Sequence, residues 1–205
     1  MNKSTRIAIY SVSALIAALA GMLFAQRMDR PAEIRALVLE APRQLPDFAL
    51  LDHRNEAFDA SRMQGRWTLL FFGFTNCPDV CPTTLDMLAR TSRSLQDLPP
   101  AEQPAVVMVS VDPMRDSTGQ LAAYVPFFDP AFVGLTGPMD QIQALTRGLG
   151  VAFAYTPSGD GDDGSYTVEH TASIFLIDPQ GRLAAVFSTP HRADELAAEY
   201  RQIVD

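Results

Sequence analysis

The chain has 205 residues, of which 47% are hydrophobic and 20% charged, a balance that is ordinary for a folded globular protein. This length suits one domain with a short appendage. The formal net charge is −8 at pH 7, and such an acidic chain is unsuited to binding nucleic acid or an anionic membrane surface, because both carry negative charge themselves.

The beginning of the chain contains a stretch without any charged residue, residues 7–25. As a helix this stretch would span about 28 Å, close to the hydrocarbon thickness of a bilayer. Lys3 and Arg6 precede it, and a short basic tail before a long domain is typical of a signal anchor. A cleaved signal peptide with its cleavage site at residues 18–20 is the rival interpretation. Because the apolar stretch continues past that site, we expect residues 1–25 to form an uncleaved N-terminal transmembrane helix.

A connector is expected between this anchor and the folded domain, over residues 26–44. Apolar residues fall on one face of a short helix over residues 32–40. Pro42 and Pro46 would end that helix. The globular domain is therefore predicted to cover residues 45–205.

Apolar runs and turn signals alternate along the rest of the chain. The predicted strands are residues 48–51 with a return at Phe58, then 67–74, 105–111, 132–135, 171–177 and 183–188, and the segments 151–155 and 166–170 are expected to flank a loop over residues 156–165. The predicted helices are residues 83–98, 121–128, 138–149 and 193–203. The run 67–74 is continuously apolar, which predicts a central strand buried on both faces. The alternation predicts an α/β domain with a mostly parallel sheet, to which a late hairpin adds antiparallel strands.

The chain has two cysteines, Cys77 and Cys81, which lie between the strand 67–74 and the following helix. Residues at i and i+4 share one helix face, so the two sulfurs can converge on one metal ion or on each other. A structural disulfide is a poor interpretation, because a disulfide stabilises most by closing a long loop. Cys81 precedes Pro82, which predicts Cys81 at the N-cap of the helix. Helix amides lower the pKa of a thiol placed there, so we expect thiolates.

Histidines decide which metal these thiolates suit. Two cysteines exclude a Cys₄ or Cys₃His zinc site within one chain, and a Cys₂His₂ site would need two of His53, His170 and His191. Two thiolates and one imidazole suit copper, either as Cu(I) or as Cu(II) with a further oxygen ligand. His170 is the predicted third ligand, because it lies where an extended segment enters the strand 172–176 and would face the cysteine loop in a thioredoxin-like sheet. His53, in a predicted surface turn, and His191, after a proline, are interpreted as structural.

Acidic residues near the same end of the sheet have two interpretations. Asp112, Arg115 and Asp116 follow a predicted strand end on the side where the cysteine loop emerges. An acid there could hydrogen-bond the metal site and tune it, or it could simply cap a solvated strand end. Asp79 between the cysteines is interpreted as a turn former rather than an oxygen ligand.

Three segments carry a resemblance to a known family. FFGFTNCPDVCPTTL, VSVDPMRD and YTVEHTASIFLIDPQG resemble, in this order, the Sco/SenC family of membrane-anchored copper-binding proteins. The resemblance implies a thioredoxin-like fold and a role in assembling the binuclear copper centre of cytochrome c oxidase. By motif, Cys77, Cys81 and His170 match the copper ligands of the family, and Asp112 matches its acid after the second strand. The chain departs from the family's frequent pattern at Asn76 and Glu169, where many members have His and Asp, and neither departure removes a ligand.

Three functions follow as hypotheses. The first is a copper metallochaperone, not an enzyme in the strict sense, which takes copper from a periplasmic donor and passes it to the copper-site subunit of cytochrome c oxidase. The second is a thiol-disulfide reductase whose redox pair Cys77 and Cys81 keeps the cysteines of that target reduced. A peroxidase-type thioredoxin relative is the third and the least favoured. For all three we expect a bacterial inner-membrane protein whose domain faces the periplasm.

Overall fold

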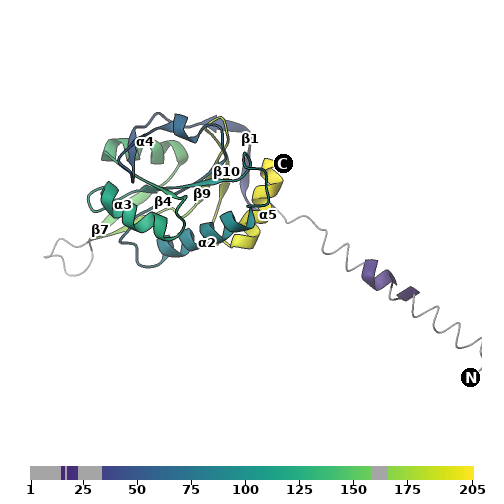
Figure 1. Ribbon diagram of the computed structural model, residues 1–205. Coiled ribbons are helices and arrows are strands. Elements are labelled where there is room, and N and C mark those ends of the chain that lie inside the picture. The colour runs from purple at the N-terminus through teal and green to yellow at the C-terminus, as the bar shows by residue number, and fades with distance from the viewer. Residues whose placement is uncertain (1–14, 17, 23–33, 158–165) are drawn as a thin grey trace, which may run out of the picture. The chain divides into compact units, whose positions relative to one another are not determined.

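The computed structural model describes residues 15–16, 18–22, 34–157 and 166–205 (Figure 1). The chain divides into two units, Met1–Glu33 and Ile34–Asp205. Most of the predicted transmembrane helix falls outside the described residues, and those described, 15–16 and 18–22, are helical. Within the described part of the chain, no helix combines the length and apolar character that crossing a membrane requires.

The unit Ile34–Asp205 is built on a mixed sheet. Its strands are β1 (Leu37–Gln44), β2 (Leu50–Asp52), β3 (Ala57–Phe58), β4 (Thr68–Gly73), β5 (Ala105–Ser110), β6 (Val133–Thr136), β9 (Ile174–Ile177) and β10 (Arg182–Phe187). They lie in the order β1-β10-β9-β4-β5-β6-β2-β3. The pairs β4–β5 and β5–β6 are parallel, and the remaining pairs are antiparallel. The predicted mixed sheet is confirmed, but the expectation that it is mostly parallel is wrong, because only the pairs β4–β5 and β5–β6 are parallel.

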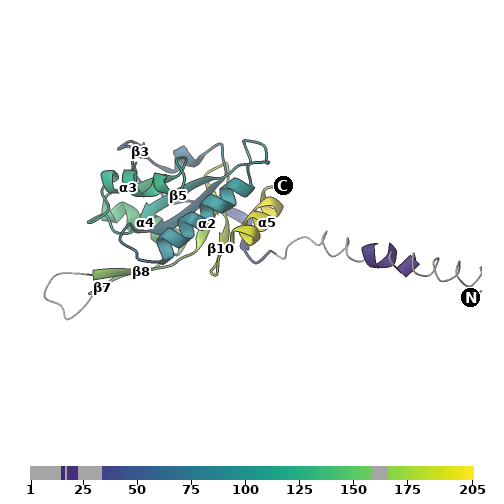
Figure 2. The ribbon, with the colours of Figure 1, turned by 60° about the horizontal axis from the view of Figure 1, so that its bottom comes forward.

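Helices cover both faces of this sheet. They are α2 (Val80–Ser94), α3 (Thr118–Tyr124), α4 (Met139–Leu149) and α5 (Ala193–Val204), with short 3₁₀ turns at Ala60–Met63 and Val125–Phe127. Figure 2 shows α2 and α5 in contact, side by side across one face. Figure 1 shows α4 on the opposite side of the sheet from α2. All six residues of β4 are buried between these layers, as the apolar run 67–74 predicted.

A separate two-stranded sheet carries the predicted third ligand. It pairs β7 (Phe153–Pro157) with β8 (Tyr166–His170), and Figure 1 shows this hairpin projecting beyond the main sheet. His170 is the last residue of β8 and pairs with Phe153 at the base of the hairpin. The segments 151–155 and 166–170, which were expected only to flank a loop, lie largely within β7 and β8 and pair with each other.

The helix predicted over residues 32–40 is wrong. Leu37–Gln44 forms β1, which pairs antiparallel with β10 at the edge of the main sheet. The described part of the expected connector thus belongs to the compact unit that begins at Ile34. The apolar spacing in this short segment is compatible with a helix or a strand, and the open edge of β10 decides in favour of the strand because it offers unpaired backbone groups.

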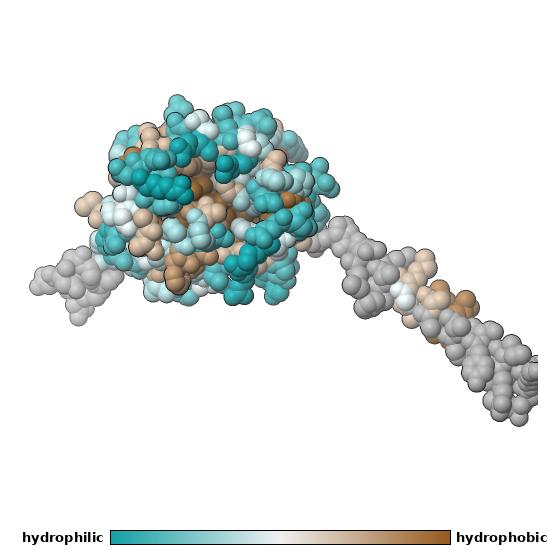
Figure 3. All heavy atoms as spheres, viewed as in Figure 1, coloured by the Kyte–Doolittle hydropathy of each residue, from teal (hydrophilic) through white to brown (hydrophobic). Residues whose placement is uncertain are grey.

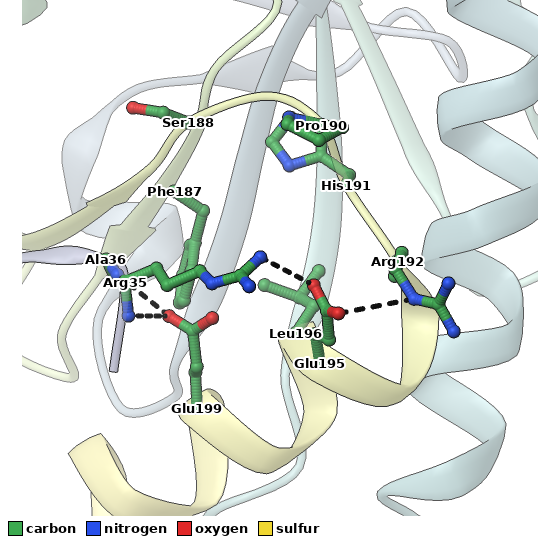
Figure 4. A pocket seen from close by; sticks show the side chains of 10 residues that line it. All are labelled: Arg35, Ala36, Phe187, Ser188, Pro190, His191, Arg192, Glu195, Leu196 and Glu199. Carbon is green, nitrogen blue, oxygen red and sulfur yellow. Dashed lines mark hydrogen bonds and ion pairs between the residues drawn. The ribbon is translucent and has the colours of Figure 1, made fainter. Parts of the chain in front are cut away.

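The start of β1 is fixed to the last helix. The Glu199 carboxylate accepts hydrogen bonds from the backbone N–H groups of Arg35 and Ala36, at 3.0 and 2.8 Å. The Arg35 side chain adds an ion pair to Glu195 at 3.3 Å (Figure 4). A buried carboxylate that accepts two backbone donors is a strong tie, so the polypeptide enters the unit held against α5.

The surface of the unit is mostly polar on the face that Figure 3 presents. Figure 3 shows mostly hydrophilic residues over the face that it presents, with apolar residues gathered in a hollow near the centre. One pocket of the unit is lined by residues of β1, β9, β10 and the end of α4, including the apolar side chains of Leu39, Leu149, Phe175 and Leu183.

Candidate metal centre

The two cysteines sit at the carboxyl end of the central strand. Gly73 ends β4, and a Cβ atom at this position would lie 3.0 Å from Cys81 Sγ and 2.8 Å from the Phe71 ring. A glycine is needed there because only it leaves room for the sulfur against the strand. Cys77 lies in the loop after β4, and its N–H donates to the Phe74 carbonyl at 3.3 Å.

Cys81 is not at the N-cap, which corrects the prediction. Asp79 is the N-cap residue, and Cys81 is the second residue of α2, followed by Pro82 in the same first turn. Proline is tolerated in the first turn because the N–H that it lacks would have no partner there. The helix can therefore begin at Val80, one residue before the cysteine, despite the bias against helical backbone before proline.

Burial overrides the helix N-terminus in setting the protonation of Cys81. The side chain is completely buried, and this burial raises the pKa of the Cys81 thiol far above its ordinary value. The predicted lowering of the pKa is wrong for this residue, because removing the thiolate from water destabilises it by more than the helix amides stabilise it. Cys77 is only half-buried. The pair thus consists of one accessible thiol and one enclosed thiol.

His170 presents its side chain to this pair. Its Nε2 lies 3.5 Å from Cys81 Sγ, and its Nδ1 lies 3.1 Å from the Thr171 carbonyl. A carbonyl can only accept, so Nδ1 carries the proton and the Nε2 lone pair faces the sulfur. The rings of Phe71 and Phe74 meet the imidazole edge-on at 6.3 and 6.0 Å. Burial lowers the pKa of His170, which keeps the ring neutral and able to act as a ligand.

These three side chains form one cluster. The ligand atoms of Cys77, Cys81 and His170 all lie within 4.8 Å of one another. Two ligand atoms on one metal ion are separated by at most about 4.6 Å when each bond is about 2.3 Å, so closing on an ion requires only small movements. Two sulfurs and one imidazole form a soft donor set, which fits copper better than a hard cation.

The acidic residues lie around the cluster rather than in it. The buried carboxylate of Asp112 accepts hydrogen bonds from Arg115 Nε at 2.5 Å and from the Tyr166 hydroxyl at 2.7 Å. Asp79 occupies the N-cap position of α2 without a capping hydrogen bond from its side chain, and its carboxylate has a 3.4 Å contact from the Thr83 hydroxyl. The interpretation of Asp79 as a local former of backbone structure agrees with this placement.

Asp116 contacts the cysteine loop itself. Its buried carboxylate accepts from the Thr75 N–H at 3.0 Å, from the Thr75 hydroxyl at 2.5 Å and from the Ser110 hydroxyl at 2.6 Å. Thr75 precedes Cys77 by two residues. The loop that presents the accessible thiol is therefore anchored by a carboxylate with three donors.

The other two histidines have the structural contacts expected of them. His53 is buried and accepts from the Gly134 N–H through Nδ1 at 3.1 Å. His191 donates through Nε2 to the Ala172 carbonyl at 2.7 Å. Neither belongs to the cluster of Cys77, Cys81 and His170.

Sequence reasoning missed the aromatic residues that support the site. Tyr166 and Tyr155 pack edge to face at 5.4 Å on the hairpin, and the guanidinium of Arg115 lies 3.8 Å over the Tyr166 ring. Tyr124 of α3 has a buried hydroxyl without a hydrogen-bond partner among the described residues. Burial raises the pKa of Tyr124, and the charges of Cys81 and Cys77 raise it further, so its hydroxyl stays protonated beside the thiols. The positions of these three tyrosines along the chain follow no periodic pattern that could have predicted these contacts.

Comparison with known proteins identifies the class. The SCO1/SenC family model matches residues 39–205, and the chain belongs to this family. A candidate copper-binding protein of Stutzerimonas stutzeri is 38% identical over 199 residues, which cover 94% of each chain. The mitochondrial protein SCO2 homolog of Bos taurus is 35% identical over 93% of this chain and 73% of its own length.

The solved structures agree with the family and define the fold. The structure of Arabidopsis thaliana ScoI with copper bound matches with a TM-score of 0.70 and 31% identity, over 77% of this chain and 98% of that one. The fold is thioredoxin-like, as predicted, with a central mixed sheet flanked by helices. A relative of this fold thus holds copper.

Proposed function

We propose that this protein is a copper metallochaperone that binds one copper ion through Cys77, Cys81 and His170. The observation that carries the proposal is the convergence of two thiols and a neutral imidazole, from two segments far apart in the chain, within 4.8 Å. The copper-bound relative of the same family supports the choice of metal. Copper is the cargo here, and the protein is not proposed to be an enzyme.

The asymmetry of the two thiols suits a protein that must release its cargo. Cys81 is enclosed beneath the loop, whereas Cys77 is accessible. An incoming thiolate or imidazole of a target can therefore approach copper from the Cys77 side before the buried ligand leaves. Exchange of this kind, in which a ligand enters before another departs, avoids a free ion in solution.

The target and the location are also proposals. Membership of the SCO1/SenC family supports the copper-site subunit of cytochrome c oxidase as the recipient and a periplasmic donor as the source. We further propose that residues 1–25 anchor the protein in a bacterial inner membrane, that a connector follows them, and that the copper-binding domain faces the periplasm. The charge-free stretch 7–25 supports the anchor.

Copper titration tests the proposed ligands. The purified protein is titrated with Cu(I) against a competing chelator, and with Cu(II) by absorption spectroscopy. We expect one copper per chain, a loss of at least about a hundredfold in Cu(I) affinity for Cys77→Ser and for Cys81→Ser, and loss of the Cu(II)–thiolate band for His170→Ala. His191→Ala is the matched control and should behave as wild type. Unchanged binding in the cysteine variants would refute the proposal.

A thiol-disulfide reductase is the second candidate, and the proximity of the two sulfurs favours it. In that reaction the Cys77 thiolate attacks a target disulfide, Cys81 Sγ then displaces the target thiol, and two electrons pass to the target as the internal disulfide forms. Reduction needs both thiols but no imidazole. If His170→Ala reduces a target disulfide at the wild-type rate yet transfers no copper, the two functions are separate.

A further inference from the structure

The position of His170 depends on a hairpin that the main sheet does not hold. Among the described residues, β7 and β8 pair only with each other and form no ladder with the eight-stranded sheet. His170 ends β8, and Thr171 contacts Ala152 at the base of the hairpin. Side-chain contacts must therefore orient the body of the hairpin relative to the cysteine loop.

One such contact is a closed set of three residues. Arg115 Nε donates to Asp112 Oδ2 at 2.5 Å, and Arg115 Nη1 donates to the Tyr166 carbonyl at 3.0 Å. The Tyr166 hydroxyl donates to Asp112 Oδ1 at 2.7 Å. The guanidinium also stacks on the Tyr166 ring at 3.8 Å. Each residue of the set contacts the other two. Tyr166, the first residue of β8, is therefore fixed to the turn that follows β5.

The same turn also holds the cysteine loop. Asp112 and Asp116 are joined within the turn, since the Asp116 N–H donates to the Asp112 carbonyl at 2.9 Å. Asp116 accepts from both the N–H and the hydroxyl of Thr75, two residues before Cys77. One turn of five residues, 112–116, therefore contacts the segment that carries the thiols and the segment that carries the imidazole.

We propose that the turn 112–116 is a positioning element that sets the distance between His170 and the cysteine pair, through two arms that can be removed separately. The Tyr166 arm, made by Asp112 and Arg115, places the histidine. The Thr75 arm, made by Asp116, places the accessible thiol. This inference rests on the proposed function only in taking these three side chains as the copper ligands.

The two oxidation states of copper separate the arms. Two thiolates are sufficient to hold Cu(I), so the imidazole contributes less to Cu(I) binding than to Cu(II) binding. Loosening the Tyr166 arm should therefore weaken Cu(II) binding much more than Cu(I) binding. Loosening the Thr75 arm should weaken both, because Cys77 serves both ions.

The test uses two conservative substitutions in the full-length protein. Tyr166→Phe removes the hydroxyl bonded to Asp112 and keeps the ring under Arg115. We expect Cu(II) affinity to fall about five- to tenfold, less than the full effect of a hydrogen bond to a charged group because the contacts of Arg115 remain, with a Cu(II) absorption spectrum shifted toward that of His170→Ala. Cu(I) affinity should stay within twofold of wild type. Thr75→Val, which removes the hydroxyl bonded to Asp116, should lower both affinities by similar factors.

A matched control excludes a general effect on stability. Tyr200→Phe removes a comparable phenol hydrogen bond, from the Tyr200 hydroxyl to the Glu102 carbonyl at 2.6 Å, in α5 away from the copper ligands. It should change neither affinity. In the metal-free protein, backbone amide exchange at Glu169 and His170 should be faster in Tyr166→Phe than in Tyr200→Phe or wild type.

The outcomes distinguish this inference from the proposed function. If Tyr166→Phe matches wild type in Cu(II) affinity, spectrum and amide exchange, or if it loses Cu(I) and Cu(II) equally, the positioning role is wrong. If the wild-type protein binds no copper at all, the proposed function is wrong, and the metal-free exchange measurement still decides whether the turn orders the hairpin.

Discussion

At the scale of single residues, the two cysteines are unequal although they belong to one short motif. Cys81 is fully enclosed, with its thiol pKa raised by burial, and Cys77 is half-buried. Thiol reactivity follows both exposure and the fraction of thiolate. The motif therefore combines an accessible thiol, Cys77, with a buried thiol, Cys81.

We predict that an alkylating reagent at pH 7.5 modifies Cys77 of the metal-free protein at least tenfold faster than Cys81. Peptide mass spectrometry over a time course measures both rates in the same sample. Protein unfolded in guanidinium chloride is the control, where the two rates should become similar. Equal rates in the folded protein would contradict the burial of Cys81.

The neutral state of His170 makes the metal-free protein sensitive to acid. Burial lowers the pKa of His170 below its ordinary 6.5, so the folded state binds fewer protons than the unfolded state as the pH falls. The stability that comes from keeping His170 neutral is fully present above the pKa of the unfolded state, and it is lost as the pH falls from that pKa toward the lower pKa of the folded state. We predict that the free energy of unfolding falls as the pH drops below about 6.5, by up to about 1.4 kcal/mol per pH unit for this residue.

Urea unfolding between pH 7.5 and 5 measures this dependence. His170→Gln removes the titrating group and keeps a polar side chain of related size, so its stability should depend less on pH over the same interval. An identical dependence in the variant and wild type would show that His170 does not titrate in this range.

The ligand residues themselves could be predicted from the sequence, whereas their environment could not. Cys77, Cys81 and His170 are the kinds of residue that soft metals require, and their approach to one another was expected from a thioredoxin-like sheet. The protonation of Cys81 depended on how deeply Phe71, Phe74 and Gly73 enclose it. The depth of burial depends on tertiary packing and cannot be derived from the order of residues in the sequence.

At the scale of elements, the close contact between β4 and the first turn of α2 depends on one glycine. A side chain at Gly73 would meet both the Phe71 ring, at 2.8 Å, and Cys81 Sγ, at 3.0 Å. Both neighbours are fully buried, so neither can move away freely. The packing of β4 against α2 and the position of Cys81 therefore both depend on the absence of a side chain at Gly73.

We predict that Gly73→Ala destabilises the protein by about 1–3 kcal/mol, the usual cost of overpacking a core. It should also weaken Cu(I) binding, because the methyl group displaces Cys81. Gly119→Ala is the matched control: its Cβ would meet only Ser117 Oγ at 3.8 Å, so its stability should stay within about 0.5 kcal/mol of wild type. Thermal unfolding and Cu(I) competition measure both effects, and a Gly73→Ala variant as stable as the control would contradict the account.

Elements with strong apolar periodicity were predicted correctly, and short amphipathic segments were not. The buried strand β4 and the helices α4 and α5 lie close to their predicted bounds. The segment Leu37–Gln44 became a strand because β10 offers it an edge. A partner almost 150 residues away along the chain decides such a case, and local periodicity carries no information about it.

At the scale of the whole molecule, the thioredoxin-like unit assembles the site from distant parts of one chain. Cys77 comes from the loop after β4, Cys81 from the first turn of α2 and His170 from the hairpin β7–β8, and the turn after β5 contacts both the cysteine loop and the hairpin. An α/β sheet could be predicted from the alternation of strands and helices, although the order of its strands in space was not. The separation of the hairpin from the main sheet could not be predicted, because its two strands have the same local pattern as strands of the sheet.

The central claim is that one copper ion binds to two thiolates and one imidazole in this fold. X-ray absorption at the copper edge of the Cu(I)-loaded protein, together with its His170→Ala and His191→Ala variants, tests it most directly. The account predicts two sulfur ligands and one histidine nitrogen in wild type and in His191→Ala, with the nitrogen lost and both sulfurs kept in His170→Ala. Copper without sulfur ligands, or a nitrogen ligand that persists in His170→Ala, would contradict it.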